Sequence, residues 1–368
     1  MPTSTAEYVP APVDAPKRQP RTSVLPAMAR NRPLLTYLGK KLLAYVVTLW
    51  AAISATFFFF HMIPGNPVGT YLQNLQSRGT FSAQAGEATL LHYKQVFGLD
   101  GSLLDQYWRF MYQLVIKHNL GPSLTNYPRP AQSVIAEALP WTVGLLAIAT
   151  VLAWLLGTAL GALTGWFRGR RASAAAVYFS VGISNIPYYF VALLLVFFMS
   201  YRWDLFPSGY AYDPTQATGL SFGFIFSVIK HGVLPAASIV IVSGAASLLG
   251  MRQQMLSVLG EDYLLLAEAK GLHPWYVLRR YAMPNCYLPQ ITGLLISFGF
   301  IFNGNVLIEN LFNYPGLGQL LLQAVNNLDI NTMIGITSLA IFMVLTAALL
   351  VDLTLPLLDP RIKQGAAR

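Results

Sequence analysis

Long apolar runs alternate with short charged segments along most of this 368-residue chain. A helix needs roughly 20 apolar residues to cross a hydrocarbon core of about 30 Å. A helix also satisfies its own backbone hydrogen bonds, which lipid cannot do. The pattern predicts an all-α integral membrane protein with six transmembrane helices, at about residues 42–63, 140–166, 173–201, 234–259, 288–311 and 330–351.

Two sequence features are expected to shape these spans. The span 173–201 is interrupted by Ser184-Asn185-Ile186-Pro187, which predicts a kink whose freed backbone groups need polar neighbours. Gly157, Gly161 and Gly165 recur at four-residue spacing in the second span. Such small residues let another helix approach closely.

The segments outside the spans differ in character. Residues 1–41 are basic and rich in proline, which predicts a disordered cytoplasmic tail. Residues 64–139 carry enough periodic apolar residues for two amphipathic helices, so we expect a small ordered external subdomain there. Residues 140–353 would form the core domain with the other five spans and a charged loop at 260–287, and residues 354–368 a cytoplasmic tail.

The composition is typical of a membrane protein, and the distribution of basic residues predicts the orientation of the chain. The chain is 55% hydrophobic, with a mean hydropathy of +0.50. Its formal charge of +9 could suggest nucleic acid, but the sequence contains no aromatic and basic recognition module. On the predicted topology, 17 of the 24 lysines and arginines lie in cytoplasmic segments. Because basic residues gather on the cytoplasmic side, both termini are expected there.

The charged stretch Glu261–Pro289 is too polar for hydrocarbon and reads as a helical hairpin on the membrane face. Good helix formers run to Lys270, and Gly271 can take the left-handed conformation that ends a helix. Pro274 suits the first turn of a second helix, and Pro284 is expected to mark its exit. A plain amphipathic cytosolic hairpin would show the same pattern.

The hairpin resembles a known loop. Ala267, the run Ala269-Lys270-Gly271-Leu272, and Pro284 thirteen residues after the glycine are similar to the EAA loop of permease subunits in binding-protein-dependent ABC importers. The match is closest to the dipeptide/oligopeptide/nickel branch. Glu268 stands where that branch has a base, and Leu265-Leu266 stand where the motif begins with Glu and Ala. The resemblance implies that this loop docks on the ATPase through Ala267, Glu268, Ala269, Lys270, Gly271, Leu272 and Pro284.

Further motifs extend the resemblance over about residues 40–363. Glu309, Phe312 and Pro315-Gly316-Leu317-Gly318 match the family's Glu-x-x-Phe-x-x-Pro-Gly-x-Gly at every named place. The stretch around Gly121-x-Ser123 and the ending Asp359-Pro360-Arg361 are also similar to the family's. The chain is thereby identified as a permease subunit with the type I ABC importer permease fold.

The resemblance also implies a function and its partners. The chain would be a non-catalytic subunit in the cell inner membrane that forms half of a translocation path by alternating access. Its partners would be a second homologous permease, two ABC ATPase subunits or domains that bind ATP and Mg, and an extracytoplasmic solute-binding protein. The branch most often carries di- and oligopeptides, but similar permeases serve nickel, opines or oligosaccharides.

Few residues of this sequence point to catalysis or to the binding of a nucleotide or metal. Gly39-Lys40 lacks the rest of a phosphate-binding loop, so ATP would be bound by another polypeptide. The five histidines have no Glu or Cys at ligand spacing, and we expect neither a metal nor a cofactor on this chain. The string Gly219–Gly223 matches a hydrolase motif but lies in an external loop beside a span, without the strand that such an enzyme needs.

Polar residues at membrane depth tend to face a cavity or a neighbouring helix. Candidates for the translocation path are Asn185, Ser243, Asn303, Asn305 and Glu309. Hydrogen bonding between helices is the simpler explanation for each of them. A gradient-driven transporter would call for acids or lysines within spans and an inverted repeat, which this sequence does not show. A scaffold without transport would leave the charged hairpin unexplained.

Overall fold

The computed structural model describes residues 27–77, 87–219, 221–301 and 305–358. The chain divides into two units, residues up to Ala44 and residues from Tyr45 onward. Every contact described below lies within the second unit. Most of the predicted tail lies outside the described residues, but a helix already begins at Ala27. The first helix therefore starts well before the predicted span.

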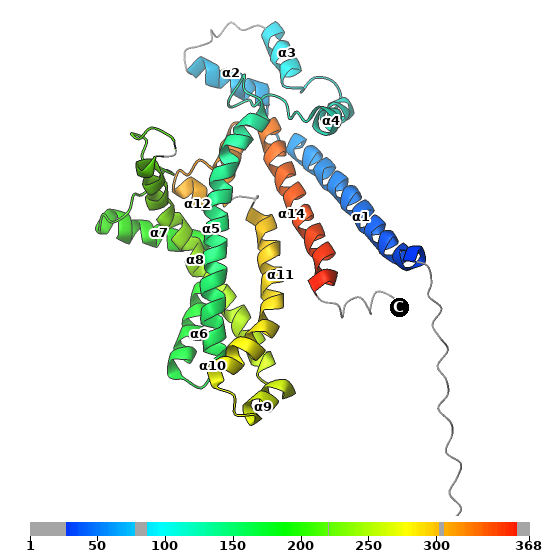
Figure 1. Cartoon of the computed structure of the whole chain (residues 1–368). Coiled ribbons are helices and arrows are strands. Elements are labelled where there is room, and N and C mark those ends of the chain that lie inside the picture. The colour runs from blue at the N-terminus through cyan, green and yellow to red at the C-terminus, as the bar shows by residue number, and fades with distance from the viewer. Residues whose placement is uncertain (1–26, 78–86, 220, 302–304, 359–368) are drawn as a thin grey trace, which may run out of the picture. The chain divides into compact units, whose positions relative to one another are not determined.

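All regular secondary structure in these described ranges is helical (Figure 1). The α-helices are α1 (Ala27–His61), α2 (Pro67–Ser77), α3 (Glu87–Val96), α4 (Leu103–Tyr112), α5 (Ala131–Trp166), α6 (Arg171–Ser184), α7 (Tyr188–Leu195), α8 (Phe222–Val258), α9 (Asp262–Ala269), α10 (Pro274–Val277), α11 (Met283–Ile301), α12 (Val306–Leu311), α13 (Leu317–Asn326) and α14 (Ile330–Leu358). Three π-helical turns continue α4, α7 and α10, namely Gln113–Lys117, Val196–Arg202 and Leu278–Ala282.

Four of the described helices are long and apolar enough to cross a membrane: part of α1, α5, α8 and most of α14. A fifth candidate is α6 together with Tyr188–Arg202, a pair bent by 101°. The bend falls at the predicted interruption before Pro187, which confirms the kink. Asn185 donates its side-chain amide to the Val181 carbonyl oxygen at 2.7 Å, so a polar neighbour does satisfy a backbone group there.

The predicted span 288–311 is not one continuous helix. The apolar part of α11, Pro289–Ile301, is shorter than the other spans, and residues 302–304 lie outside the described ranges. Asn305 then starts α12, where its side-chain oxygen accepts a hydrogen bond from the Ile308 N–H at 3.3 Å. An asparagine in this position caps a new helix, and apolarity alone did not reveal the break.

Helices α5 and α8 pack along one another over much of their length (Figure 1). The glycine stripe of α5 forms the contact, which confirms the close approach predicted from its spacing. A Cβ atom placed on Gly161 would lie 2.5 Å from the Leu248 carbonyl oxygen, and one on Gly157 would lie 2.5 Å from that of Gly244. Only a residue without a side chain fits at these two positions.

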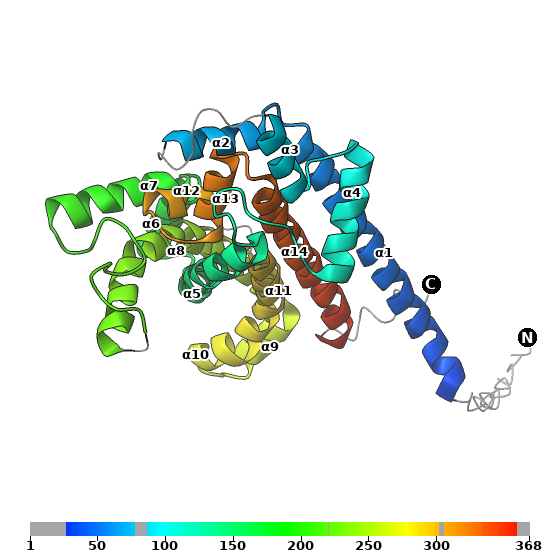
Figure 2. The same cartoon turned by 90° about the horizontal axis from the view of Figure 1, so that it is seen from above.

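Residues 64–139 contain α2, α3 and α4, one helix more than expected, and α5 already begins at Ala131. They lie at the end of α5 opposite to α9 and α10, near α13 (Figures 1 and 2). Four aromatic rings pack together at this end, those of Tyr71, Tyr93, Phe97 and Tyr127. Tyr93 and Phe97 stack with their centroids 6.0 Å apart, and the other pairs meet edge to face at 5.2 to 6.2 Å. This aromatic cluster joins α2 and α3 to the loop before α5.

A buried carboxylate fastens the same loop to α14. Asp329 accepts hydrogen bonds from the Ser123 hydroxyl at 2.5 Å and the Thr125 N–H at 3.0 Å. It also accepts from the Thr332 N–H at 3.2 Å and so caps the start of α14. Asn331 donates to the Pro122 carbonyl oxygen at 2.9 Å. The Gly121-x-Ser123 stretch noted in the sequence therefore serves to dock this loop.

The α5–α8 contact predicts a position-dependent effect of adding one methyl group. Gly161→Ala should lower the free energy of unfolding by about 1–3 kcal/mol, because the added Cβ meets the backbone of α8. Gly144→Ala is the matched control, since a Cβ at Gly144 of the same helix meets nothing within 4 Å. Thermal unfolding of the two variants in detergent measures the difference. Equal midpoints would contradict the proposed packing constraint.

Candidate functional site

The charged hairpin folds as two short helices joined by a tight bend. Asp262 lies in the first turn of α9, where a carboxylate suits the helix dipole. Gly271 ends the helix with φ +74°, which confirms its predicted left-handed conformation. His273 then caps α10, its Nδ1 accepting from the Trp275 N–H at 3.3 Å, and Pro274 occupies the first turn. The sequence encodes this bend locally.

Pro284 does not end the hairpin as predicted. The chain runs from α10 through the π-helical turn Leu278–Ala282 directly into α11, and Pro284 lies in the first turn of α11. Because proline lacks a backbone donor, it is tolerated at the start of a helix and disrupts the ladder elsewhere. The wider π-helical turn just before it takes up this irregularity.

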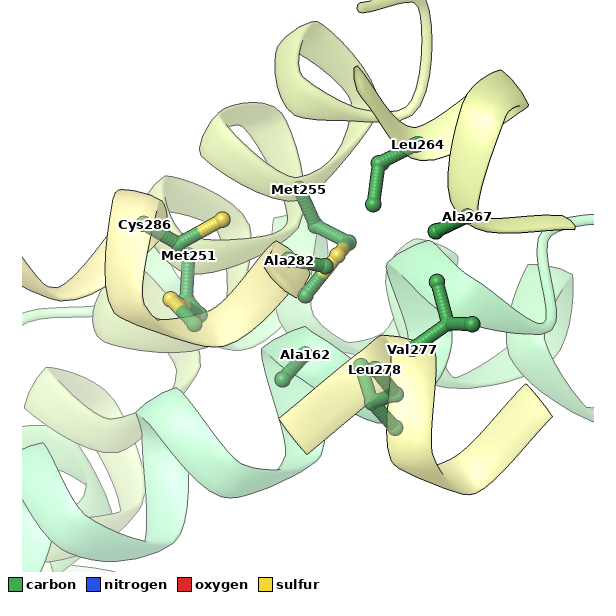
Figure 3. Packing of buried hydrophobic residues seen from close by; sticks show 9 residues of the cluster. All are labelled: Ala162, Met251, Met255, Leu264, Ala267, Val277, Leu278, Ala282 and Cys286. Carbon is green, nitrogen blue, oxygen red and sulfur yellow. The ribbon is translucent and has the colours of Figure 1, made fainter. Parts of the chain in front are cut away.

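One face of the hairpin is packed into the protein (Figure 3). Leu264 and Ala267 from α9 point toward Met255 of α8 and Val277 of α10, and all four are at most 3% exposed. The same cluster includes Ala162 of α5, Met251, Leu278, Ala282 and Cys286. This hairpin cluster anchors α9 on the ends of α5, α8 and α11.

The other face of the hairpin is open. Leu265 and Leu266 are 58% and 57% exposed. Glu268, Ala269, Lys270, Gly271 and Pro284, all expected from the resemblance to meet a partner, are exposed as well. Ala267 is buried and Leu272 packs against the hairpin cluster.

The outward leucines were not among the predicted contact residues. They could have been found from the helical period: if Leu264 and Ala267 face inward, the two residues between them face outward. Burial, with a smaller effect of the Glu261 carboxylate, raises the pKa of Tyr263 beside them.

The predicted path residue Glu309 has an evident structural role. It is fully buried, and its Oε2 accepts hydrogen bonds from the N–H groups of Gly318 at 2.7 Å and Gln319 at 3.2 Å. Its Oε1 accepts from the Thr142 hydroxyl at 2.8 Å, and the Thr142 oxygen accepts from the Leu317 N–H at 2.7 Å. The first turn of α13 is thus bound by a carboxylate from α12 and a hydroxyl from α5.

The glycine before α13 belongs to the same arrangement. A Cβ on Gly316 would lie 2.3 Å from Glu309 Oε2 and 2.4 Å from Thr142 Oγ1. The Glu-x-x-Phe-x-x-Pro-Gly-x-Gly motif therefore describes a carboxylate, the turn that follows it and the helix start that it caps.

Helices α5, α8 and α11 line an open cavity of about 610 Å³, called here the inner cavity. Of the predicted path residues, Ser243 and Asn305 line it, whereas Asn185 and Glu309 do not, and Asn303 lies outside the described residues. Its other polar side chains are Thr150, Trp154, Tyr188, Ser247, Gln290 and Ser297. The polar lining consists of hydroxyl, amide and indole groups.

A match to a known protein family shows to which class of proteins this chain belongs. Residues 157–364 match the model of the binding-protein-dependent transport system inner membrane component. This chain belongs to that family. The match covers α6 to α14, with the hairpin and the Glu309 motif inside it.

Individual relatives extend the similarity beyond these residues. The chain is 31% identical over 334 residues to a protein of Brucella ovis described as a peptide permease, covering 90% of this chain and 99% of the relative. It is 29% identical to the D,D-dipeptide transport system permease protein DdpB of Escherichia coli K12, covering 84% and 92%. The dipeptide transport system permease protein DppB of Bacillus subtilis is 28% identical, covering 89% and 97%.

Family membership makes the chain a non-catalytic, multi-pass subunit of the cytoplasmic membrane in an ABC transporter. It has the type I permease fold, and its all-helical structure with four to five apolar spans is consistent with that class. A solute-binding protein and an ATPase are its expected partners in this family.

The hydrogen bonds of Glu309 lead to a stability prediction. Glu309→Gln replaces one acceptor oxygen by an NH₂ group, so buried donors of Thr142 or α13 lose their partner. The free energy of unfolding should fall by about 1–3 kcal/mol. Hydrogen exchange at the start of α13 should speed up at the same time. Glu261→Gln, at an exposed carboxyl that makes no cap hydrogen bond, is the control and should change neither quantity. Unchanged exchange in α13 would refute the capping role.

Proposed function

We propose that this chain forms half of a translocation pathway for di- or oligopeptides in an ATP-driven importer. The two-sided hairpin carries the proposal: α9 is anchored by Leu264 and Ala267 while Leu265 and Leu266 face outward. Three relatives named as peptide or dipeptide permeases support the substrate class.

The complete machine would contain a second permease of the same fold and two ATPase subunits or domains that hold ATP and Mg. Both termini and the hairpin would lie in the cytoplasm, as the excess of lysine and arginine in those segments favours. Residues 64–139 and 202–231 would then face a solute-binding protein on the outside. The placement of α2–α4 at the end of α5 opposite to the hairpin agrees with this orientation.

The hairpin would couple the ATPase to the spans mechanically. Exposed leucines on an anchored helix can enter an apolar groove, as amphipathic helices do in other complexes. Because α9 is packed on α8 and α5 through the hairpin cluster, a push on its outer face moves those helices with it. Lys270 and Glu268 would add charged contacts at the rim of the interface.

The inner cavity would be this chain's share of the path. Its hydroxyl and amide groups can donate to and accept from a peptide backbone of any sequence. Nickel is held in proteins mainly by imidazole, thiolate or carboxylate groups. None of these groups lines the inner cavity as far as its residues are described, so peptides fit it better.

Coupling can be tested by changing the outer face of the hairpin. Lys270→Glu, or the pair Leu265→Ser and Leu266→Ser, should reduce uptake in proteoliposomes at least about tenfold, a loss of about 1.4 kcal/mol in coupling. The subunit should still insert, and ATP hydrolysis should no longer depend on the loaded receptor. Arg168→Glu, the same charge reversal on another exposed turn, is the control. Normal coupled uptake in the hairpin variants would refute the coupling role.

The bend gives a second coupling prediction. Gly271→Val places a β-branched residue at φ +74° and should strain the hairpin by about 1–3 kcal/mol. Uptake should fall while the spans remain folded. Gly271→Asn is the matched variant, because asparagine tolerates the left-handed conformation, and it should retain most uptake. Equal uptake in the two variants would show that the bend geometry does not matter.

The path can be tested by narrowing the inner cavity. Ser243→Phe should obstruct it and lower peptide uptake at least about tenfold, while the complex assembles normally. Ser257→Phe, an exposed position of α8 away from the cavity, is the matched control. Uptake and the yield of assembled complex are measured side by side. Unimpaired uptake in Ser243→Phe would show that the inner cavity is not part of the translocation path.

A further inference from the structure

A second cavity, of about 360 Å³, lies where α5 begins beside α13. It is called here the outer cavity. It shares no lining residue with the inner cavity. The side chains that matter for its chemistry are Arg129, Glu137, Trp141, Tyr212, Gln319 and Gln323. In Figure 1, α5 starts at the end of the molecule that carries α2 and α3.

The outer cavity contains one charge of each sign. Arg129 Nη2 and Glu137 Oε1 form an ion pair, with 45% and 65% of their side chains exposed. An exposed pair of this kind contributes little to stability, so a ligand can open it at small cost. A ligand with both a carboxylate and an ammonium group could replace the internal pair with two new ones.

The walls beside this pair are fixed by neighbouring groups. Trp141 stacks on Tyr212 at a centroid distance of 5.6 Å and meets the edge of Tyr314 at 6.0 Å. The Gln319 side-chain amide donates to Asn313 Oδ1, which leaves its own oxygen as an acceptor. Gly316, held against Glu309 and Thr142, also lines the cavity and gives it a rigid border.

We propose that the outer cavity binds a short peptide through its free termini, with the carboxylate at Arg129 and the ammonium at Glu137. Trp141 and Tyr212 would contact an apolar side chain, and Gln319 would accept from the peptide backbone. Two extended residues span roughly 7 Å, a distance that an opened ion pair can bridge. The inference rests on the proposed peptide function and adds a solute site on the permease outside the inner cavity.

Shape and charge favour a small peptide over a side chain of the receptor. The volume lies within the range of small-molecule sites, about 300–1,000 Å³. Both charges line this one small cavity, whereas contacts between proteins spread over much larger areas. Tryptophan, tyrosine and arginine are also common in protein interfaces, so receptor contact is the competing outcome of the test.

The test uses the assembled complex in nanodiscs, without receptor or nucleotide. Ala-Ala is titrated, and the fluorescence attributable to Trp141 is obtained by subtracting the signal of the Trp141→Phe complex. We expect a saturable change. N-acetyl-Ala-Ala and Ala-Ala-amide should each bind about tenfold more weakly, because each lacks one charge-assisted hydrogen bond. No saturable Trp141 signal would overturn the proposal.

Two variants test which residue binds which terminus of the peptide. Arg129→Gln should weaken the binding of Ala-Ala about tenfold but leave the binding of Ala-Ala-amide unchanged. Glu137→Gln should weaken the binding of Ala-Ala about tenfold but leave the binding of N-acetyl-Ala-Ala unchanged. Arg109→Gln, which breaks a comparable ion pair with Asp100, is the control and should have no effect. Equal losses for free and blocked peptides would overturn the assignment.

Parallel assays separate this inference from the proposed function. If the complex imports peptide with receptor and ATP but shows no Trp141 response, only the outer cavity is refuted. If the variants weaken receptor binding while Ala-Ala gives no response, the surface contacts the receptor and the proposal fails. A complete importer that carries no peptide at all would overturn both the proposed function and the inference.

Discussion

The structure depends on one buried carboxylate. Glu309 of α12 has no exposure to solvent and satisfies its acceptors with two backbone N–H groups of α13 and the Thr142 hydroxyl of α5. A buried carboxylate is tolerated only when it is hydrogen-bonded in this way, and removing its partners is costly. The requirement fixes three segments at a single point. It also explains why the turn contains Gly316, because any larger residue would collide with both the carboxylate and the hydroxyl.

From this point α5 reaches the opposite end of the core, and its pairing with α8 makes the connection stiff. Close approach through Gly157 and Gly161 leaves no side-chain layer between the two backbones, so they cannot slide without collision. At the far end, Ala162, Met251 and Met255 belong to the hairpin cluster that seats α9. One packed unit therefore links the Glu309 turn to the hairpin. Such a unit is what a coupling mechanism needs, since force applied to a loosely attached loop would be lost.

The sequence predicted the features that local geometry determines. The glycine spacing of α5, the left-handed bend at Gly271 and the break before Pro187 all follow from properties of a few neighbouring residues. It did not reveal contacts between residues that lie far apart in the chain. The polarity of Glu309 at membrane depth predicts a path residue, but it does not reveal the hydrogen bond to Thr142, 167 positions away. The motif predicts an ATPase contact at Ala267, and the structure packs this residue against Met255 and Val277. A motif marks positions and not directions, so it did not show that Leu265 and Leu266 face outward.

The two cavities differ in a way that fits directional transport. Charges of both signs line the outer cavity, whereas hydroxyl, amide and indole groups supply the polar lining of the inner one. Passage through a membrane requires sites that are attractive enough to enter and weak enough to leave. On the proposed path, the charged groups of the outer cavity would bind the termini of a peptide and aid its capture from water. The same groups deeper in the path would hold the peptide and would cost more to bury, because charges are expensive at membrane depth. A neutral inner lining can exchange hydrogen bonds with successive peptide groups at little cost, so a peptide on the proposed path would move on once its termini are released.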